Sequence, residues 1–271
     1  LTDAFTTEPA QEGGAWVFTY RGDDGTLVYR ITPESGTWGD ISARWQGRGE
    51  AFRPCADGGV RLTTADSPAL PERAELLGAD REGDAVTMRW RIAAAGTEAE
   101  VAYTYRLWGK SLVIDTVCPG GLVGEVRYGY AEGLESPRLV TSPYYVYRTT
   151  RPAVVVAGPE DAPLFLSGDT DWYRTNSSQL WGINEISEGR VTYQGGVRYH
   201  PKTDGTRNDC FERFFLTVSP RYEEVLPTID NPRSPWFEAT GTRLWRAHGA
   251  GNREADAAFW RRVHRHGMTE V

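Results

Sequence analysis

The chain has 271 residues, enough for one large domain with a sizeable core, or for a domain and part of a second one. Its formal charge of −7 disfavours a nucleic-acid partner, because phosphate binding needs a basic surface. No apolar run approaches the length of about 18 residues that a membrane-spanning helix needs. The three cysteines are widely spaced, which favours neither a disulfide framework nor a zinc motif, although one pair could still bridge.

Strand-like runs dominate the first two hundred or so residues. After a polar stretch, 1–14, expected to form a loose lead-in, two β-type runs flank Gly22, Asp23, Asp24 and Gly25, a hairpin signal. Alternate residues of the later run 98–108 share one face, as a half-buried strand requires. Further strands are predicted at 39–46, 59–64, 73–80, 85–93, 111–118, 123–132, 138–147, 153–157, 163–168, 190–200 and 210–218.

The organisation changes after Pro227. A proline-rich connector is followed by a predicted strand at 242–247 and a helix at 252–266. Asn252 can cap this helix, and Gly267 can end it. An apolar stripe on the helix is formed by Ala255, Phe259, Trp260 and Val263. Residues 268–271 are interpreted as the opening of another strand, so the sequence is expected to be a fragment that stops inside a βα unit.

Four stretches carry a resemblance: 105–115 (YRLWGKSLVID), the loop and strand 199–227, 242–250 (TRLWRAHGA) and 259–271 (FWRRVHRHGMTEV). They resemble the amino-terminal, galactose-mutarotase-like β-super-sandwich domain that precedes a TIM barrel in several multidomain glycoside hydrolases. The succession of strands with no strong helix between them predicts an all-β fold of two stacked antiparallel sheets. The resemblance likewise implies a two-sheet antiparallel β-super-sandwich over residues 1–228, with a connector, one helix and the start of a barrel over 229–271. It also implies that the catalytic carboxyl groups belong to the barrel, beyond Val271.

The resemblance therefore predicts a non-catalytic domain of a glycoside hydrolase, with carbohydrate and a C-terminal catalytic barrel as partners. A stand-alone mutarotase-like enzyme and a purely structural domain are the alternatives. The expected location is extracellular or periplasmic, with the cytoplasm left open. A sequence that starts at Leu1 without a leader is compatible with a secreted protein whose signal peptide has been removed.

Segment 169–188 has little periodicity and is expected to be a long excursion from the sheet. Its aromatic side chains could stack on sugar rings, and its polar side chains could bind hydroxyl groups. The alternative is a loop folded over the sandwich with these aromatics buried. The candidates for sugar contact in this segment are Asp169, Asp171, Trp172, Tyr173, Asn176, Trp181 and Glu185.

A second candidate region is the polar loop before the strand at 210–218. Asp204, Arg207 and Asn208 could grip neighbouring hydroxyl groups, or the loop could be a solvated turn. No cofactor is predicted, but Asp204, Asn208 and Asp209 offer oxygen atoms that calcium could use. Glu212, beside Arg213 in the strand, is expected to form a buried or cross-strand ion pair.

A suitably placed histidine would distinguish a mutarotase-like enzyme from a binding or structural domain. A mutarotase would need a histidine and a carboxylate to move protons on the sugar. Only His200 lies in the β region, where Glu185 or Glu212 could partner it. A structural role before Pro201 is the competing interpretation.

Overall fold

The computed structural model describes residues 4–65, 67–141, 152–226, 232–241 and 251–268. Strands account for 53% of the chain and helices for 10%, so the predicted all-β class is confirmed. The chain divides into two compact units, Leu1–Thr228 and Ile229–Val271. That the second unit begins a barrel stays a prediction.

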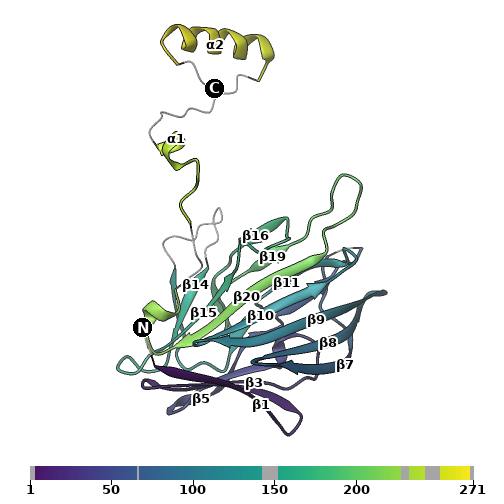
Figure 1. Ribbon diagram of the computed structural model, residues 1–271, viewed down its shortest axis with the longest axis vertical. Helices are drawn as coiled ribbons and strands as arrows, with labels where there is room; N and C mark the ends of the chain where they lie inside the picture. The colour runs from purple at the N-terminus through teal and green to yellow at the C-terminus, as the bar shows by residue number, and fades with distance from the viewer. Residues whose placement is uncertain (1–3, 66, 142–151, 227–231, 242–250, 269–271) are drawn as a thin grey trace. The chain divides into compact units, whose positions relative to one another are not determined.

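Within the described part of the first unit the strands form three antiparallel sheets, where the sequence predicts two (Figure 1). The first sheet has the order β1 (Phe5–Glu12), β2 (Ala15–Gly22), β3 (Gly25–Ile31), β4 (Ile41–Trp45), β5 (Arg48–Ala56), β12 (Tyr130–Glu132), β18 (Arg190–Thr192), β17 (Glu185–Ser187). The second has the order β13 (Arg138–Thr141), β14 (Ala153–Ala157), β15 (Leu164–Thr170), β20 (Cys210–Ser219), β10 (Ser111–Cys118), β9 (Thr97–Trp108), β8 (Ala85–Ala94), β7 (Arg73–Glu82). The third, smaller sheet has the order β16 (Gln179–Trp181), β19 (Gly196–Arg198), β11 (Val123–Arg127), β6 (Gly59–Leu62).

The core lies between the inward faces of these sheets. The predicted alternation in β9 is confirmed, because Val101, Tyr103, Tyr105 and Leu107 are all buried while the residues between them are more exposed. Trp38, in the short 3₁₀ helix η1 (Trp38–Asp40), is fully buried and makes an edge contact at 4.8 Å with the ring of Phe214 in the second sheet. Large aromatic rings therefore fill the space between the layers.

Buried tyrosine hydroxyl groups add polar ties across this core. The Tyr29 hydroxyl of β3 lies 2.8 Å from the carbonyl oxygen of Lys110 and accepts a hydrogen bond from Val218 N at 3.1 Å. The Tyr128 hydroxyl lies within hydrogen-bond distance of two backbone oxygens of the second sheet, at 2.5 Å from Asp169 O and 2.9 Å from Phe215 O. Since a buried hydroxyl is costly without a partner, these bonds favour one relative position of the sheets.

Several features differ from the sequence predictions. The single strands predicted at 123–132 and 190–200 are each two strands, one in the first sheet and one in the third. Residues 5–12 are not a loose lead-in but strand β1, which pairs along its whole length with β2. Strand β5 is absent from the predicted elements, because bulges interrupt its pairing and obscure its alternation. Segment 169–188 is not a continuous excursion: Asp169 and Thr170 end β15, and the segment also contains β16 and β17.

The second unit contains the short helix α1 (Phe237–Gly241) and the predicted helix, α2 (Arg253–Arg265). The Asn252 side chain caps α2 by accepting a hydrogen bond from Ala255 N at 2.8 Å, and Gly267 follows it with a φ of +87°. The predicted strands at 242–247 and 268–271 lie wholly or almost wholly outside the described residues. No helix in the described ranges is long and apolar enough to cross a membrane.

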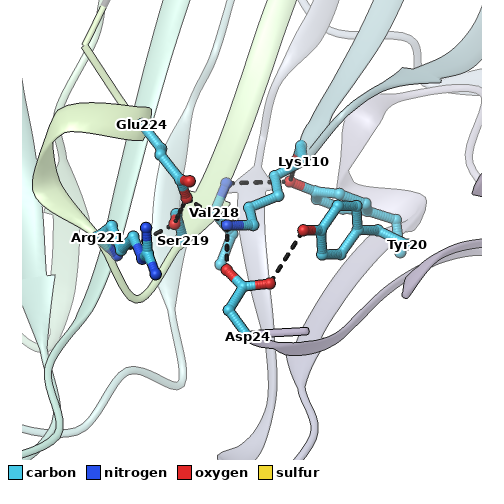
Figure 2. Close-up of polar contacts among 8 residues, drawn as sticks. Tyr20, Asp24, Lys110, Val218, Ser219, Arg221 and Glu224 are labelled. Carbon is cyan, nitrogen blue, oxygen red and sulfur yellow. Dashed lines mark hydrogen bonds and ion pairs between the residues drawn. The ribbon is translucent and has the colours of Figure 1, made fainter. Parts of the chain in front are cut away.

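A buried ion cluster lies at one end of the sandwich (Figure 2). The ammonium group of Lys110, in the turn between β9 and β10, contacts the carboxylates of Asp24 and Glu224. Asp24 belongs to the β2–β3 turn, and Glu224 to the 3₁₀ helix η2 (Tyr222–Glu224). All three side chains are at most 10% exposed, so each charge depends on the others for compensation. Burial raises the pKa of Glu224, but hydrogen bonds from Lys110 and Ser219 outweigh it and lower the pKa overall.

Replacing the buried lysine should strongly destabilise the first unit. Lys110→Met leaves two buried carboxylates without their cation, and we expect a loss of about 3–5 kcal/mol in the free energy of unfolding. Lys202→Met is the matched control, because Lys202, the other lysine, is exposed. Urea denaturation at pH 7 would measure both, and an unchanged midpoint for Lys110→Met would contradict this role.

The loss of stability in Lys110→Met should also depend on pH. The stability that Glu224 contributes is present above the ordinary pKa of a glutamate and is lost as pH falls through its lowered folded-state pKa. Wild type and Lys110→Met should therefore differ less in acid than at pH 7.

Candidate functional site

The structure brings two of the predicted regions together at one end of the strands. Residues 171–178 follow β15 and residues 199–209 connect β19 to β20; together they form what we call the loop surface. The Asn208 side chain donates to Asn176 O at 2.8 Å, and the Asn176 side chain donates to Asp209 O at 2.8 Å. These bonds, between residues more than thirty positions apart, hold the loops as one surface.

An aromatic pair stands on this surface. The rings of Trp172 and Tyr173 are 6.0 Å apart, and Tyr173 is 54% exposed while Trp172 is half-buried. Asp171 supports the pair: its backbone N donates to Arg213 O at 2.9 Å, and its carboxylate accepts from Tyr173 N at 3.2 Å. Asp171 is itself only 8% exposed, so its position suits a supporting residue.

Three predicted residues belong to other parts of the fold. Glu185 is exposed in β17, in the first sheet, and Trp181 is in β16 of the third sheet. The guanidinium of Arg198 lies 4.4 Å above the ring of Trp181, so this face of the ring is covered. Asp169 is 8% exposed within β15. The sequence segment that contains them is thus distributed over three sheets.

Most polar side chains of the loop 199–209 have protein partners. Asp204 accepts from the backbone and side chain of Thr206 at 2.9 and 2.7 Å, and these bonds lower its pKa. Arg207 donates to Tyr199 O at 3.0 Å, and Asp209 accepts from Gly120 N at 2.8 Å. Among the described residues there is no group of three or more His, Cys, Asp or Glu that could hold a metal ion.

Glu212 lies fully buried beneath the loop surface. Its Oε1 accepts from Thr175 Oγ1 at 3.0 Å, from Asn176 N at 3.3 Å and from the Tyr199 hydroxyl. Its Oε2 is buried with no partner among the described residues. Burial raises the pKa of Glu212 more than these hydrogen bonds lower it.

The predicted ion pair of Glu212 is wrong. Neighbouring residues in a strand face opposite sides of the sheet, so Arg213 points away from Glu212. Arg213 instead pairs with Asp115 at 2.6 Å, and Asp115 also accepts from Arg106 at 2.8 Å. The sequence could not show this, because the partners of Glu212 come from loops that are distant along the chain.

His200 is exposed, and its Nε2 lies 2.8 Å from the side-chain oxygen of Gln179. Neither Glu185 nor Glu212 is its hydrogen-bond partner in the described structure. The arrangement of a histidine and a carboxylate in an open pocket, which would favour a mutarotase, is therefore not found at His200.

Sequence reasoning missed a pocket of about 550 Å³ on the first sheet. It is rich in hydroxyl and carboxyl groups, among them those of Thr32, Glu34, Ser35, Asp40, Ser42, Asp57 and Tyr130. Asp40 is not free for a ligand, because it accepts hydrogen bonds from the backbone N of Glu34, Ser35 and Gly36. The turn-forming residues after Thr32 were the available signal, and of residues 34–38 only Gly36 and Trp38 are buried.

We expect the buried Glu212 to oppose folding at neutral pH. With a raised folded-state pKa, its favourable contribution is fully present below the ordinary pKa of a glutamate and is lost as pH rises through the folded-state value. Glu212→Gln should lack this loss, so its stability relative to wild type should rise between pH 4 and 8. Glu223→Gln, at an exposed position in η2, is the control. Parallel pH profiles of unfolding midpoints for wild type and Glu212→Gln would contradict the prediction.

Comparison with known proteins gives no family. No protein-family model matches the chain, and no curated protein matches it. A function for the chain therefore rests on the fold, the geometry of the loop surface and the resemblance carried by the segments 105–115, 199–227, 242–250 and 259–271.

Proposed function

We propose that this chain is a non-catalytic, carbohydrate-associated domain of a glycoside hydrolase. It packs on a catalytic barrel and presents the loop surface to a sugar. The observation that carries the proposal is the Trp172–Tyr173 pair, which is partly exposed and held in place by Asp171.

The chemistry of the surface fits a saccharide. A sugar ring has an apolar face that stacks on aromatic rings and a rim of hydroxyl groups that need donors and acceptors. The aromatic pair offers the first contact, and the neighbouring amide groups of Asn176 and Asn208 offer the second. Their cross-loop hydrogen bonds reduce the entropy that binding would otherwise cost.

The carboxyl groups near the loop surface do not suit hydrolysis. Glycosidases use two carboxyl groups on either side of the bond, about 5 to 10 Å apart. Glu212 is fully buried, while Asp204 and Asp209 accept hydrogen bonds from their own or a neighbouring loop. These positions support an accessory role, with the catalytic groups in another part of the parent enzyme.

Loss of the aromatic pair should weaken sugar binding. We expect Trp172→Ala and Tyr173→Ala each to raise the dissociation constant for a bound oligosaccharide about tenfold, because each variant loses the binding free energy of one ring stacked on a sugar. Trp108→Ala is the control, because Trp108 is 61% exposed but lies beside Ser111, at the other end of β10 from the loops. Calorimetry with a panel of oligosaccharides would measure this. Equal loss in all three variants would argue against a site on the loop surface.

The chain by itself should hydrolyse no glycoside. The test is an assay of this chain and of a longer form that includes a catalytic barrel, on aryl glycosides and oligosaccharides. We expect turnover only with the longer form. Hydrolysis by the chain itself would overturn the accessory role and make Glu185, Asp204, Asp209 and Glu212 the residues to substitute.

A further inference from the structure

The outward face of the third sheet carries three guanidinium groups around one carboxylate. Val60, Val126 and Val197 point into the core, so the residues between them in the strands point outward. There Glu125 accepts from Arg127 Nε at 2.9 Å and from Arg198 Nε at 3.2 Å. We call the group made of Arg61, Glu125, Arg127, Trp181 and Arg198 the arginine face.

The positive charge of this face is not fully compensated. Arg127 and Arg198 occupy both oxygens of Glu125. Arg61, which is opposite Glu125 in the sheet register, donates to the backbone oxygen of Asp57 at 3.3 Å and to no other group in the described part of the chain. Its Nε is buried with no partner among the described residues. Burial and the charge of Arg127 lower its pKa more than the charges of Glu125 and Asp57 raise it. A cationic cluster of this kind is unexpected in a chain of net charge −7.

The guanidinium groups of Arg127 and Arg198 are both reachable and fixed. The side chains of Arg127 and Arg198 are 33% and 41% exposed, and no described residue accepts a hydrogen bond from the terminal nitrogens of Arg198. Trp181 supports them, with its ring 4.4 Å from the guanidinium of Arg198 and 5.6 Å from that of Arg127. A Cβ at Gly195 would lie 2.7 Å from this ring, so glycine allows the close packing.

The arginine face continues directly from the loop surface. Arg198 immediately precedes the loop 199–209, and its carbonyl oxygen accepts from Ser178 N, at the end of the segment 171–178, at 2.9 Å. His200 and Gln179, hydrogen-bonded to each other at 2.8 Å, lie next along the same two segments. The loop surface and the arginine face are therefore joined through the backbone of Arg198 and Ser178.

We propose that the arginine face binds the carboxylate or sulfate group of an acidic saccharide whose neutral part lies on the loop surface. The inference rests on the proposed sugar-binding function and adds the class of sugar. The oxyanion would accept hydrogen bonds from Arg61, Arg127 and Arg198 in the planar geometry that guanidinium groups favour.

Calorimetry with three probes tests this: an oligogalacturonate, the same oligomer with its carboxyl groups reduced to alcohols, and a heparin-derived sulfated oligosaccharide. Wild type should bind at least one acidic probe about tenfold or more tighter than the neutral oligomer. The acidic probe that binds more tightly shows whether the face prefers a carboxylate or a sulfate group. The preference should shrink as the NaCl concentration rises.

Arg61→Gln is the informative variant, because Arg61 makes no hydrogen bond to Glu125 and its loss leaves the other two pairs intact. It should lose most of the preference for the acidic probe and keep its affinity for the neutral one. Arg44→Gln is the control, since Arg44 is exposed in β4 of the first sheet. Unfolding midpoints verify that both variants fold.

The outcomes separate this inference from the proposed function. Equal binding of acidic and neutral probes would overturn the inference and leave the sugar-binding function standing. Binding of none of the probes would overturn both. An acidic preference that survives in Arg61→Gln would overturn the assignment of the anion to the arginine face.

Discussion

The relative position of the two large sheets depends on a buried charge that needs opposite charges beside it. The Lys110 ammonium group has low exposure and sits between Asp24 and Glu224, which come from two other segments of the chain. Each of the three charges is tolerable only when the other two are in place, so the β2–β3 turn, the β9–β10 turn and η2 must come together. The Tyr29 hydroxyl, which reaches the backbone of both Lys110 and Val218, ties the same end of the sandwich from within the core.

The register of β20 fixes which of its side chains face the core. Strand β20 starts beside the loop surface and ends beside the ion cluster, and its successive side chains point to opposite faces of the sheet. Its inward residues supply the core and, near one end, the buried carboxyl of Glu212; its outward residue Arg213 joins Asp115 and Arg106. A shift of one residue would exchange these faces and expose the core, so packing and site geometry cannot vary independently.

The loop surface and the arginine face show two ways of holding polar groups in fixed positions. Backbone oxygens and side-chain amides fix the first, across loops that have no regular structure of their own. The second is built on paired strands, where sheet register places Arg61, Glu125 and Arg198 side by side and a tryptophan supports them. The arginine face is thus a local excess of cations in a chain whose net charge is negative.

Local signals were enough to predict the all-β class, the hairpin at residues 22–25, the alternation of β9 and the capped helix α2, because each depends on neighbours within a few positions. Strands β1 and β5 escaped detection, since the first is polar and the second is bulged, and both are defined by their pairing. The candidate residues were also named from the sequence, but their grouping was not. Asn176 meets Asn208 across 32 positions, and Lys110 meets Glu224 across 114. Only the tertiary structure decided which polar groups share a surface, which of them are buried and which arginines lack a carboxylate partner. The physical reason is that contacts between residues so far apart in the chain leave no periodic pattern in the sequence.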